Sequence, residues 1–251
     1  MCCPGASRVL LVFFPLVLAF GESGGPEAVT AAASRSTPPA IVIGFVGGFV
    51  SHSNRVHSTV QVIEHLRNEY AAGAYVQAFE NHRRGQAYKE ILRRLDVNHD
   101  GVLSSDEKQK ARIILFGHSW GASETVTLAR KLEQDGVPVL LTIQVDSVAK
   151  IGQNDQVIPA NVKEAVNFFQ PSGLVHGQRQ IRAADPARTQ IVGNYRFDYK
   201  ENRLACLSYP WFNRIFIKSH TQIECDPKVW SQVESLIYSK LAPEAPRTAA
   251  R

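Results

Sequence analysis

Residues 112–134 read RIILFGHSWGASETVTLARKLEQ, and three kinds of sequence follow one another in this stretch. The apolar run at residues 112–116 predicts a buried strand, and residues 122–134 have helical spacing. Between them lies Gly117-His118-Ser119-Trp120-Gly121, which matches the pattern G-x-S-x-G. In a tight strand-to-helix turn the flanking glycines avoid collisions and the serine oxygen stands clear of the sheet. We therefore predict that Ser119 is a nucleophile.

From residue 39 onward, apolar β-rich runs alternate with segments of helical spacing. The expected strands are residues 40–43, 74–79, 112–116, 137–145 and 189–195, and the expected helices are residues 57–71, 87–95, 122–134, 160–169 and 229–241. This alternation is typical of βαβ units around a parallel sheet. We predict an α/β fold, a three-layer αβα sandwich with a mainly parallel sheet.

The composition is that of an ordinary globular protein. Of the 251 residues, 44% are hydrophobic and 20% are charged, which excludes disordered chains, collagen-like repeats and disulfide-dense small scaffolds. The net charge is +5, from 28 Lys and Arg against 23 Asp and Glu. The basic residues are scattered singly or in short pairs, such as Arg83-Arg84. Because no basic block is present, we expect no nucleic-acid partner.

The N-terminal residues have the layout of a secretory signal peptide. Residues 1–8 carry one positive charge and precede an apolar run at residues 9–20. This run is shorter than the ~20 residues of a membrane-spanning helix, and Pro15 interrupts it. We predict a signal peptide at residues 1–21, cleavage before Glu22, a secreted or periplasmic location and no stable membrane span.

The segments on either side of the folded part are poor in large apolar side chains. Residues 22–38 are rich in small and polar residues, and residues 242–251 are rich in Pro and Ala. Such segments bury too little apolar surface to fold. We expect a flexible leader at residues 22–38, one domain at residues 39–241 and a disordered tail at residues 242–251.

A serine nucleophile needs a histidine base and an acid that orients it. When a G-x-S-x-G turn carries the serine, the acid and then the histidine follow it in the chain. Only His176 and His220 follow Ser119, and His220 is preferred because it lies shortly before the last helix. Asp146 is the preferred acid because it ends a predicted strand. Three other acids remain alternatives: Asp155, Asp185 and Asp198.

Acyl transfer also needs backbone donors for the oxyanion. One expected donor is the amide of Trp120, directly after the nucleophile. The glycine-rich turn that follows the first strand, at Gly47 and Gly48, is expected to supply another, because glycine lets the backbone approach a substrate closely.

These features in this order resemble the α/β-hydrolase superfamily over most of residues 39–241. The position of Asp146 is similar to that of the acid in some lipases and thioesterases. The histidine of an HGGG-type motif is missing from the glycine turn, and no strand pair precedes residue 39, so a reduced sheet is expected. The resemblance implies a serine hydrolase that cleaves a small-molecule or lipid-like ester or thioester through an acyl-enzyme on Ser119. A peptidase or amidase with the same triad remains open.

Residues 96–107, DVNHDGVLSSDE, match the twelve-residue loop of an EF-hand. The positions that supply oxygen ligands in such loops hold Asp96, Asn98, Asp100, the carbonyl of Val102, Ser104 and Glu107. We expect one structural Ca²⁺, since the strand carrying Ser119 follows too soon for the helix pair of a sensor. An acidic solvated turn is the other interpretation of the loop. The alternative function is a calcium-binding EF-hand protein on a catalytically inactive hydrolase scaffold.

Two cysteines remain after removal of a signal peptide, Cys206 and Cys225, 19 residues apart. Export would place them in an oxidising compartment, where a disulfide persists. Closing such a loop is worth about 3 kcal/mol in the chain-entropy model. Two separately buried thiols are the other interpretation. The sequence predicts no particular oligomeric state.

Overall fold

The structure is a computed structural model that describes residues 38–70 and 73–241. The predicted signal peptide, residues 22–37 of the predicted leader and the predicted tail lie outside the described residues.

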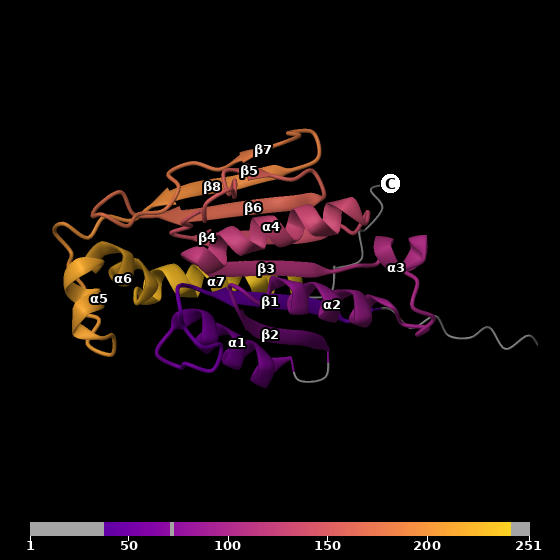
Figure 1. The fold of residues 1–251 in the computed structure, drawn as a ribbon, viewed down its shortest axis with the longest axis horizontal. Coiled ribbons are helices and arrows are strands. Elements are labelled where there is room, and N and C mark those ends of the chain that lie inside the picture. Colours follow the sequence, from indigo (N-terminus) through magenta and orange to yellow (C-terminus); the bar gives the residue numbers. More distant parts are fainter. Residues whose placement is uncertain (1–37, 71–72, 242–251) are drawn as a thin grey trace, which may run out of the picture. The chain divides into compact units, whose positions relative to one another are not determined.

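Six parallel strands form the central sheet (Figure 1). They are β1 (Ala40–Val46), β2 (Ala74–Glu80), β3 (Ile113–His118), β4 (Val139–Val145), β6 (Val162–Phe169) and β8 (Gln190–Arg196). Their order across the sheet is β2-β1-β3-β4-β6-β8, and every neighbouring pair is parallel. Two short strands, β5 (Val157–Ile158) and β7 (Arg182–Ala183), pair separately.

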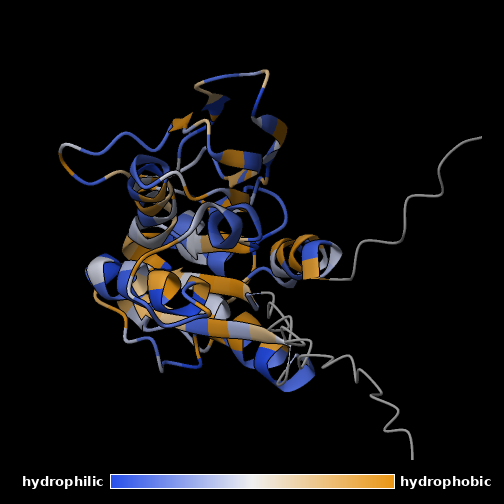
Figure 2. Cartoon of the chain, turned by 90° about the vertical axis from the view of Figure 1, so that its right-hand side faces the viewer, coloured by the Kyte–Doolittle hydropathy of each residue, from blue (hydrophilic) through white to orange (hydrophobic). Residues whose placement is uncertain are grey.

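Helices cover both faces of the sheet. The helices are α1 (Ser58–Glu69), α2 (Arg84–Leu95), α3 (Ser105–Gln109), α4 (Trp120–Gln134), α5 (Trp211–Phe216), α6 (Lys218–Glu224) and α7 (Pro227–Leu241). Apolar residues of α1 and α7 pack on one face, and those of α2 and α4 pack on the other. Every residue of β1 and of β3 is buried, as expected for strands covered on both faces. Figure 2 shows hydrophobic (orange) and hydrophilic (blue) segments alternating along the helices, as expected for helices that pack one face on the sheet.

The predicted three-layer αβα sandwich with a mainly parallel sheet is confirmed. Nine of the ten expected elements form with shifted ends, but the helix expected at residues 160–169 is wrong, because Val162–Phe169 is strand β6. This strand lies between β4 and β8 and is almost wholly buried. In a short run buried on both faces, apolar spacing does not distinguish a strand from a helix. The β-branched Val162 and Val166 favour the strand that forms.

Within the described part of the chain, no helix combines the length and the apolar character needed to cross a membrane.

Candidate active site

Two of the three predicted catalytic residues, Ser119 and Asp146, lie at the carboxyl ends of neighbouring strands. His118 at the end of β3 pairs with Val145 at the end of β4, so Ser119 and Asp146 are the next residues on adjacent strands. The amide of Ser119 donates to the carbonyl of Val145 at 3.0 Å. Parallel strands bring their carboxyl ends to one edge of a sheet, where ligands of open α/β sheets bind.

Ser119 occupies a strained turn between β3 and α4. Its φ of 58° and ψ of −127° are rare for a residue with a side chain. The turn is pressed against β1, since a Cβ on Gly121 would lie 2.2 Å from the Phe45 carbonyl oxygen, and one on Gly117 would lie 2.7 Å from it. Only glycine fits these two positions. The turn therefore holds the hydroxyl of Ser119 above the sheet edge, and Ser119 is 8% exposed.

His220, from α6, is hydrogen-bonded to Asp146. The distance from His220 Nδ1 to Asp146 Oδ2 is 2.6 Å, and both side chains are buried. A carboxylate only accepts hydrogen bonds, so Nδ1–H donates to it and the lone pair of Nε2 is left free. This is the tautomer that a general base needs.

Three further donors fix the carboxylate of Asp146. The amide of Gly177 donates to Oδ1 at 2.7 Å, the amide of Gln170 donates to Oδ1 at 3.2 Å, and Gln170 Nε2 donates to Oδ2 at 2.9 Å. A Cβ on Gly177 would lie 2.6 Å from Asp146 Cα, so only glycine allows this approach. Sequence analysis did not select Gln170 or Gly177. No sequence signal marked either residue, because residues 160–169 were expected to form a helix.

The ring of His220 lies against the residue that precedes the nucleophile. The rings of His118 and His220 have centroids 4.5 Å apart and planes tilted by 33°. Within the described residues no hydrogen bond joins Ser119 Oγ to His220. Such bonds often form only when a substrate binds.

Two of the three predicted oxyanion donors, Trp120 and Gly47, lie next to Ser119, and Gly48 follows Gly47 in the turn. Trp120 is the first residue of α4, and a Cβ on Gly47 would lie 2.9 Å from Ser119 Cβ. Asn81 Nδ2 donates to the carbonyl of Val46 at 3.3 Å and to that of Gly48, which holds the glycine turn in place. Asn81 is buried, and sequence analysis did not select it.

A buried group of titratable side chains, His57, His118 and Glu224, lies next to the site. His57 Nδ1 is hydrogen-bonded to Glu224 Oε1, and His118 Nδ1 lies 3.5 Å from Glu224 Oε2. Burial raises the pKa of Glu224, but the hydrogen bond from His57 opposes it and holds that pKa below its usual value. Burial lowers the pKa of His118 to about 4. At neutral pH, therefore, His118 is uncharged and Glu224 is ionised.

The other sequence candidates have different partners. His176 lies 3.5 Å from the carbonyl of its neighbour Gly177. Asp155 accepts a 2.5 Å hydrogen bond from Ser147, Asp185 accepts one from the amide of Ala187, and Asp198 pairs with Arg196. Within the described residues, none of these three acids bonds a histidine. The geometry thus favours Asp146 over its rivals.

The EF-hand-like loop connects α2 to α3. Asp96 Oδ2 accepts from the amide of Gly101 at 3.0 Å, and Asp100 Oδ1 accepts from the amide of Val102 at 2.8 Å. Gly101 has a φ of +80°, as the sharp turn at this position requires. Each of these carboxylates keeps an oxygen lone pair for a cation.

In this structure the carboxylate of Glu107 accepts hydrogen bonds from backbone amides. Its Oε2 accepts from the amide of Ser104 at 2.9 Å, which completes a capping box for α3, and its Oε1 accepts from the amide of Val97 at 2.9 Å. Over residues 38–70 and 73–241, no three His, Cys, Asp or Glu side chains converge as they would around a metal ion. The oxygen donors fit Ca²⁺ in chemical type, and binding would need Glu107 to turn toward the loop.

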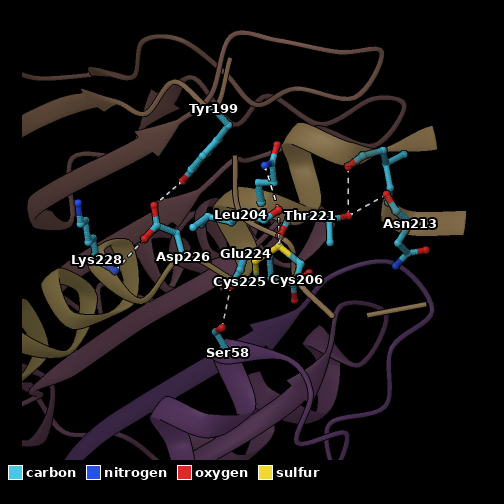
Figure 3. The surroundings of a disulfide bond; sticks show 12 residues. Ser58, Tyr199, Leu204, Cys206, Asn213, Thr221, Glu224, Cys225, Asp226 and Lys228 are labelled. Atoms are coloured by element: carbon cyan, nitrogen blue, oxygen red, sulfur yellow. Dashed lines mark hydrogen bonds between the residues drawn. A yellow bond between two sulfur atoms is a disulfide. The ribbon is translucent and has the colours of Figure 1, made fainter. Parts of the chain in front are cut away.

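A disulfide joins Cys206 to Cys225, with Cα atoms 5.9 Å apart (Figure 3). The ring that it closes contains α5 and α6 and therefore His220. Next to Cys225, the Glu224 carbonyl accepts from Ser58 Oγ at 2.7 Å. On the other side, Asp226 accepts from Tyr199 at 2.8 Å. These bonds, drawn in Figure 3, anchor the end of the ring to α1 and to the chain after β8.

The chain matches no protein-family model and no curated protein sequence. Among solved structures it is similar to dienelactone hydrolase from Anabaena variabilis, with 11% identity over 80% of this chain and 84% of that chain and a TM-score of 0.37. It is also similar to a thermostable esterase from Pseudomonas putida, with 12% identity, coverages of 84% and 77% and a TM-score of 0.43. A cutinase-like protein from Cryptococcus sp. has 12% identity, coverages of 85% and 100% and a TM-score of 0.41. Because these likenesses are distant, an assignment of activity rests on the geometry of the site.

Proposed function

We propose that the protein is an exported serine hydrolase that cleaves an ester or thioester through an acyl-enzyme on Ser119. The observation that carries this proposal is the buried 2.6 Å hydrogen bond from His220 to Asp146, beside a serine in a strained strand-to-helix turn. A histidine oriented by a carboxylate next to a serine in such a turn is the arrangement that nucleophilic catalysis requires.

In the proposed reaction, His220 Nε2 takes the proton of Ser119 as Oγ bonds to the substrate carbonyl carbon. The amides of Trp120 and of the Gly47-Gly48 turn bind the oxyanion of the tetrahedral intermediate. When the intermediate collapses, the bond to the leaving group breaks and His220 gives the proton to that group. Water then attacks the acyl-enzyme by the same route, which releases the acid and restores Ser119.

The surroundings of Ser119 favour an acyl group with an apolar part. Phe49 is 99% exposed, and its ring meets that of Trp120 edge to face, with centroids 5.5 Å apart. The amide of Trp120 is itself a proposed oxyanion donor, and Phe49 follows the Gly47-Gly48 turn that supplies the others. Apolar rings with a few placed polar groups are typical of small-molecule sites.

A fluorophosphonate probe tests this proposal, because it reacts only with an activated serine. We expect the purified protein to label with one probe, Ser119→Ala to lose all labelling, and His176→Asn to label as the parent does. Mass spectrometry of peptides identifies the labelled residue. An unlabelled parent protein would instead favour the catalytically inactive, calcium-binding scaffold, and labelling elsewhere would refute the role of Ser119.

Reduction of Cys206–Cys225 should lower activity before it unfolds the domain. The disulfide closes the ring that carries His220, so reduction frees this segment while the sheet stays intact. Hydrolysis of a nitrophenyl ester and circular dichroism are measured on the same sample as reductant is added. The double variant Cys206→Ser/Cys225→Ser is the control and should not respond to reductant. Parallel loss of activity and structure would contradict the prediction.

We further propose that the loop at residues 96–107 binds one structural Ca²⁺. Asp96, Asn98, Asp100, Ser104, the Val102 carbonyl and Glu107 would hold the ion, which would tie α2 to α3 just before β3. A single loop joined directly to the strand that precedes Ser119 suits a stabilising ion rather than a sensor. The support is the set of hard oxygen donors and the turn at Gly101.

Calcium removal should lower the melting temperature. An ion present at about a hundred times its Kd stabilises by about 2.7 kcal/mol, a shift of roughly 5 to 10 °C for a domain of this size. Glu107→Gln should abolish the shift, because glutamine preserves the capping box but loses the bidentate carboxylate. Asp106→Asn is the matched control, since Asp106 pairs with Lys110 outside the ligand set. An unchanged melting temperature in chelator would refute the site.

A further inference from the structure

The segment between the two disulfide cysteines carries a large exposed apolar surface. We define the α5 patch as the five side chains Leu207, Trp211, Phe212, Ile215 and Phe216, each between 50% and 77% exposed. None of the six residues of α5 is buried. Contiguous apolar surfaces of this kind usually mark a binding site in a soluble protein.

Positive charge lies directly beside the α5 patch. A cavity of about 310 Å³ is lined by Arg203, Arg214 and Lys218, together with Leu204, Ala205, Cys206, Thr221 and Gln222. No acidic residue lines it, and the sequence has no Asp or Glu from residue 202 to residue 223. Within the described residues, none of the three cations forms an ion pair. The cavity thus presents uncompensated positive charge next to exposed aromatic rings.

We propose that the α5 patch and these three cations dock the protein on an anionic lipid surface. Aromatic and aliphatic side chains flanked by Lys and Arg are what a membrane interface binds, with rings among the acyl chains and cations at the phosphates. A second copy of the chain fits less well, because a symmetric contact would set the same cations against one another. An anionic lipid neutralises them.

The position of the α5 patch determines which edge of the protein would face the lipid. Helix α5 precedes α6, which carries His220, and both lie at the end of the sheet where β3 and β4 end (Figure 1). Docking would turn the edge that carries Ser119 toward the lipid. The proposal does not depend on the proposed hydrolysis, since binding can be measured with Ser119→Ala.

Sedimentation with vesicles tests the proposal. Ser119→Ala protein with its disulfide intact is mixed with vesicles of phosphatidylcholine alone or of equal parts phosphatidylcholine and phosphatidylglycerol. We expect binding to the anionic vesicles at least tenfold stronger than to the neutral ones, as about 1 kcal/mol for each cation implies. Arg214→Gln/Lys218→Gln should remove most of this preference. Trp211→Ser/Phe216→Ser should weaken binding to both vesicles by at least about tenfold.

Matched controls separate docking from general effects of charge and apolarity. Lys89→Gln removes an exposed cation from α2, and Ile151→Ser removes a fully exposed apolar side chain from a loop. Both should bind as the parent does. Brominated phosphatidylglycerol should quench tryptophan fluorescence in the parent, and Trp211→Phe should lose this quenching.

Two results would overturn the proposal. One is equal binding of the Trp211→Ser/Phe216→Ser variant and its parent to anionic vesicles. The other is a dimer in analytical ultracentrifugation that the same variant abolishes, with no vesicle binding by the parent, because the patch would then hold a second copy. Weak labelling of Ser119 by a fluorophosphonate would count against the proposed hydrolysis only. It would leave the proposal of lipid docking unchanged.

Discussion

Asp146→Asn is expected to lower kcat about 10⁴-fold while the protein stays folded. In the parent, the carboxylate accepts from His220 Nδ1 and thereby leaves Nε2 as the base. An asparagine in its place can turn its amide toward His220, which favours the tautomer with the proton on Nε2. That tautomer cannot take a proton from Ser119. Steady-state hydrolysis of a nitrophenyl ester measures the loss, and circular dichroism checks the fold.

Asp155→Asn is the matched control for this experiment. Asp155 is also buried and also lies after β4, but it accepts its hydrogen bond from Ser147 and bonds no histidine. Its substitution should leave kcat unchanged and lower stability only. If instead Asp155→Asn lost activity and Asp146→Asn kept it, the acid would be one of the rivals named from the sequence.

The positions of the candidate residues could be predicted because chain order and topology constrain them. Each of Ser119 and Asp146 follows an apolar run that forms a buried strand, and adjacent parallel strands bring such residues together. His220 could be preferred because few histidines follow Ser119. The helix expected at residues 160–169 was wrong because Val162, Ala165 and Val166 have the i, i+3, i+4 spacing of a helix although they lie in strand β6.

The residues that hold the catalytic side chains in place could not be predicted from one sequence. His57 and Glu224 are separated by 167 residues, and nothing local to either position indicates the contact. The same holds for Gln170 and Gly177, whose bonds to Asp146 depend on where the loop after β6 runs. Helices α5 and α6 have only six and seven residues, too few for a periodic pattern to show.

The neutral, buried His118 should make the domain acid-sensitive between about pH 6.5 and pH 4. Its pKa is about 4 in the folded protein, and an unfolded histidine titrates near 6.5. Between these values the unfolded chain binds a proton that the folded protein does not, so the free energy of unfolding decreases as the pH falls. The slope is about 1.4 kcal/mol per pH unit, and the total is about 3 to 4 kcal/mol.

The groups around His118 explain why it stays neutral despite two carboxylates nearby. Burial is the largest cause, and it outweighs the attraction of Glu224 and Asp146, while His220 and His57 add repulsion. His118 Nε2 is buried without a hydrogen-bond partner in the described part of the chain, so a proton there would have no acceptor. The lowered pKa of Glu224 also costs stability in acid, mainly below about pH 4.5, where more than half of an unfolded glutamate is protonated.

Urea unfolding from pH 3.5 to pH 7 measures this effect. His118→Gln keeps a neutral polar side chain at the position and should flatten the dependence of the unfolding free energy on pH. His82→Gln is the control, because His82 is exposed and should leave the slope as it is in the parent. An unchanged slope in His118→Gln would mean that another buried group takes up the proton, and Glu224→Gln would then show whether the loss occurs mainly below about pH 4.5, as its lowered pKa requires.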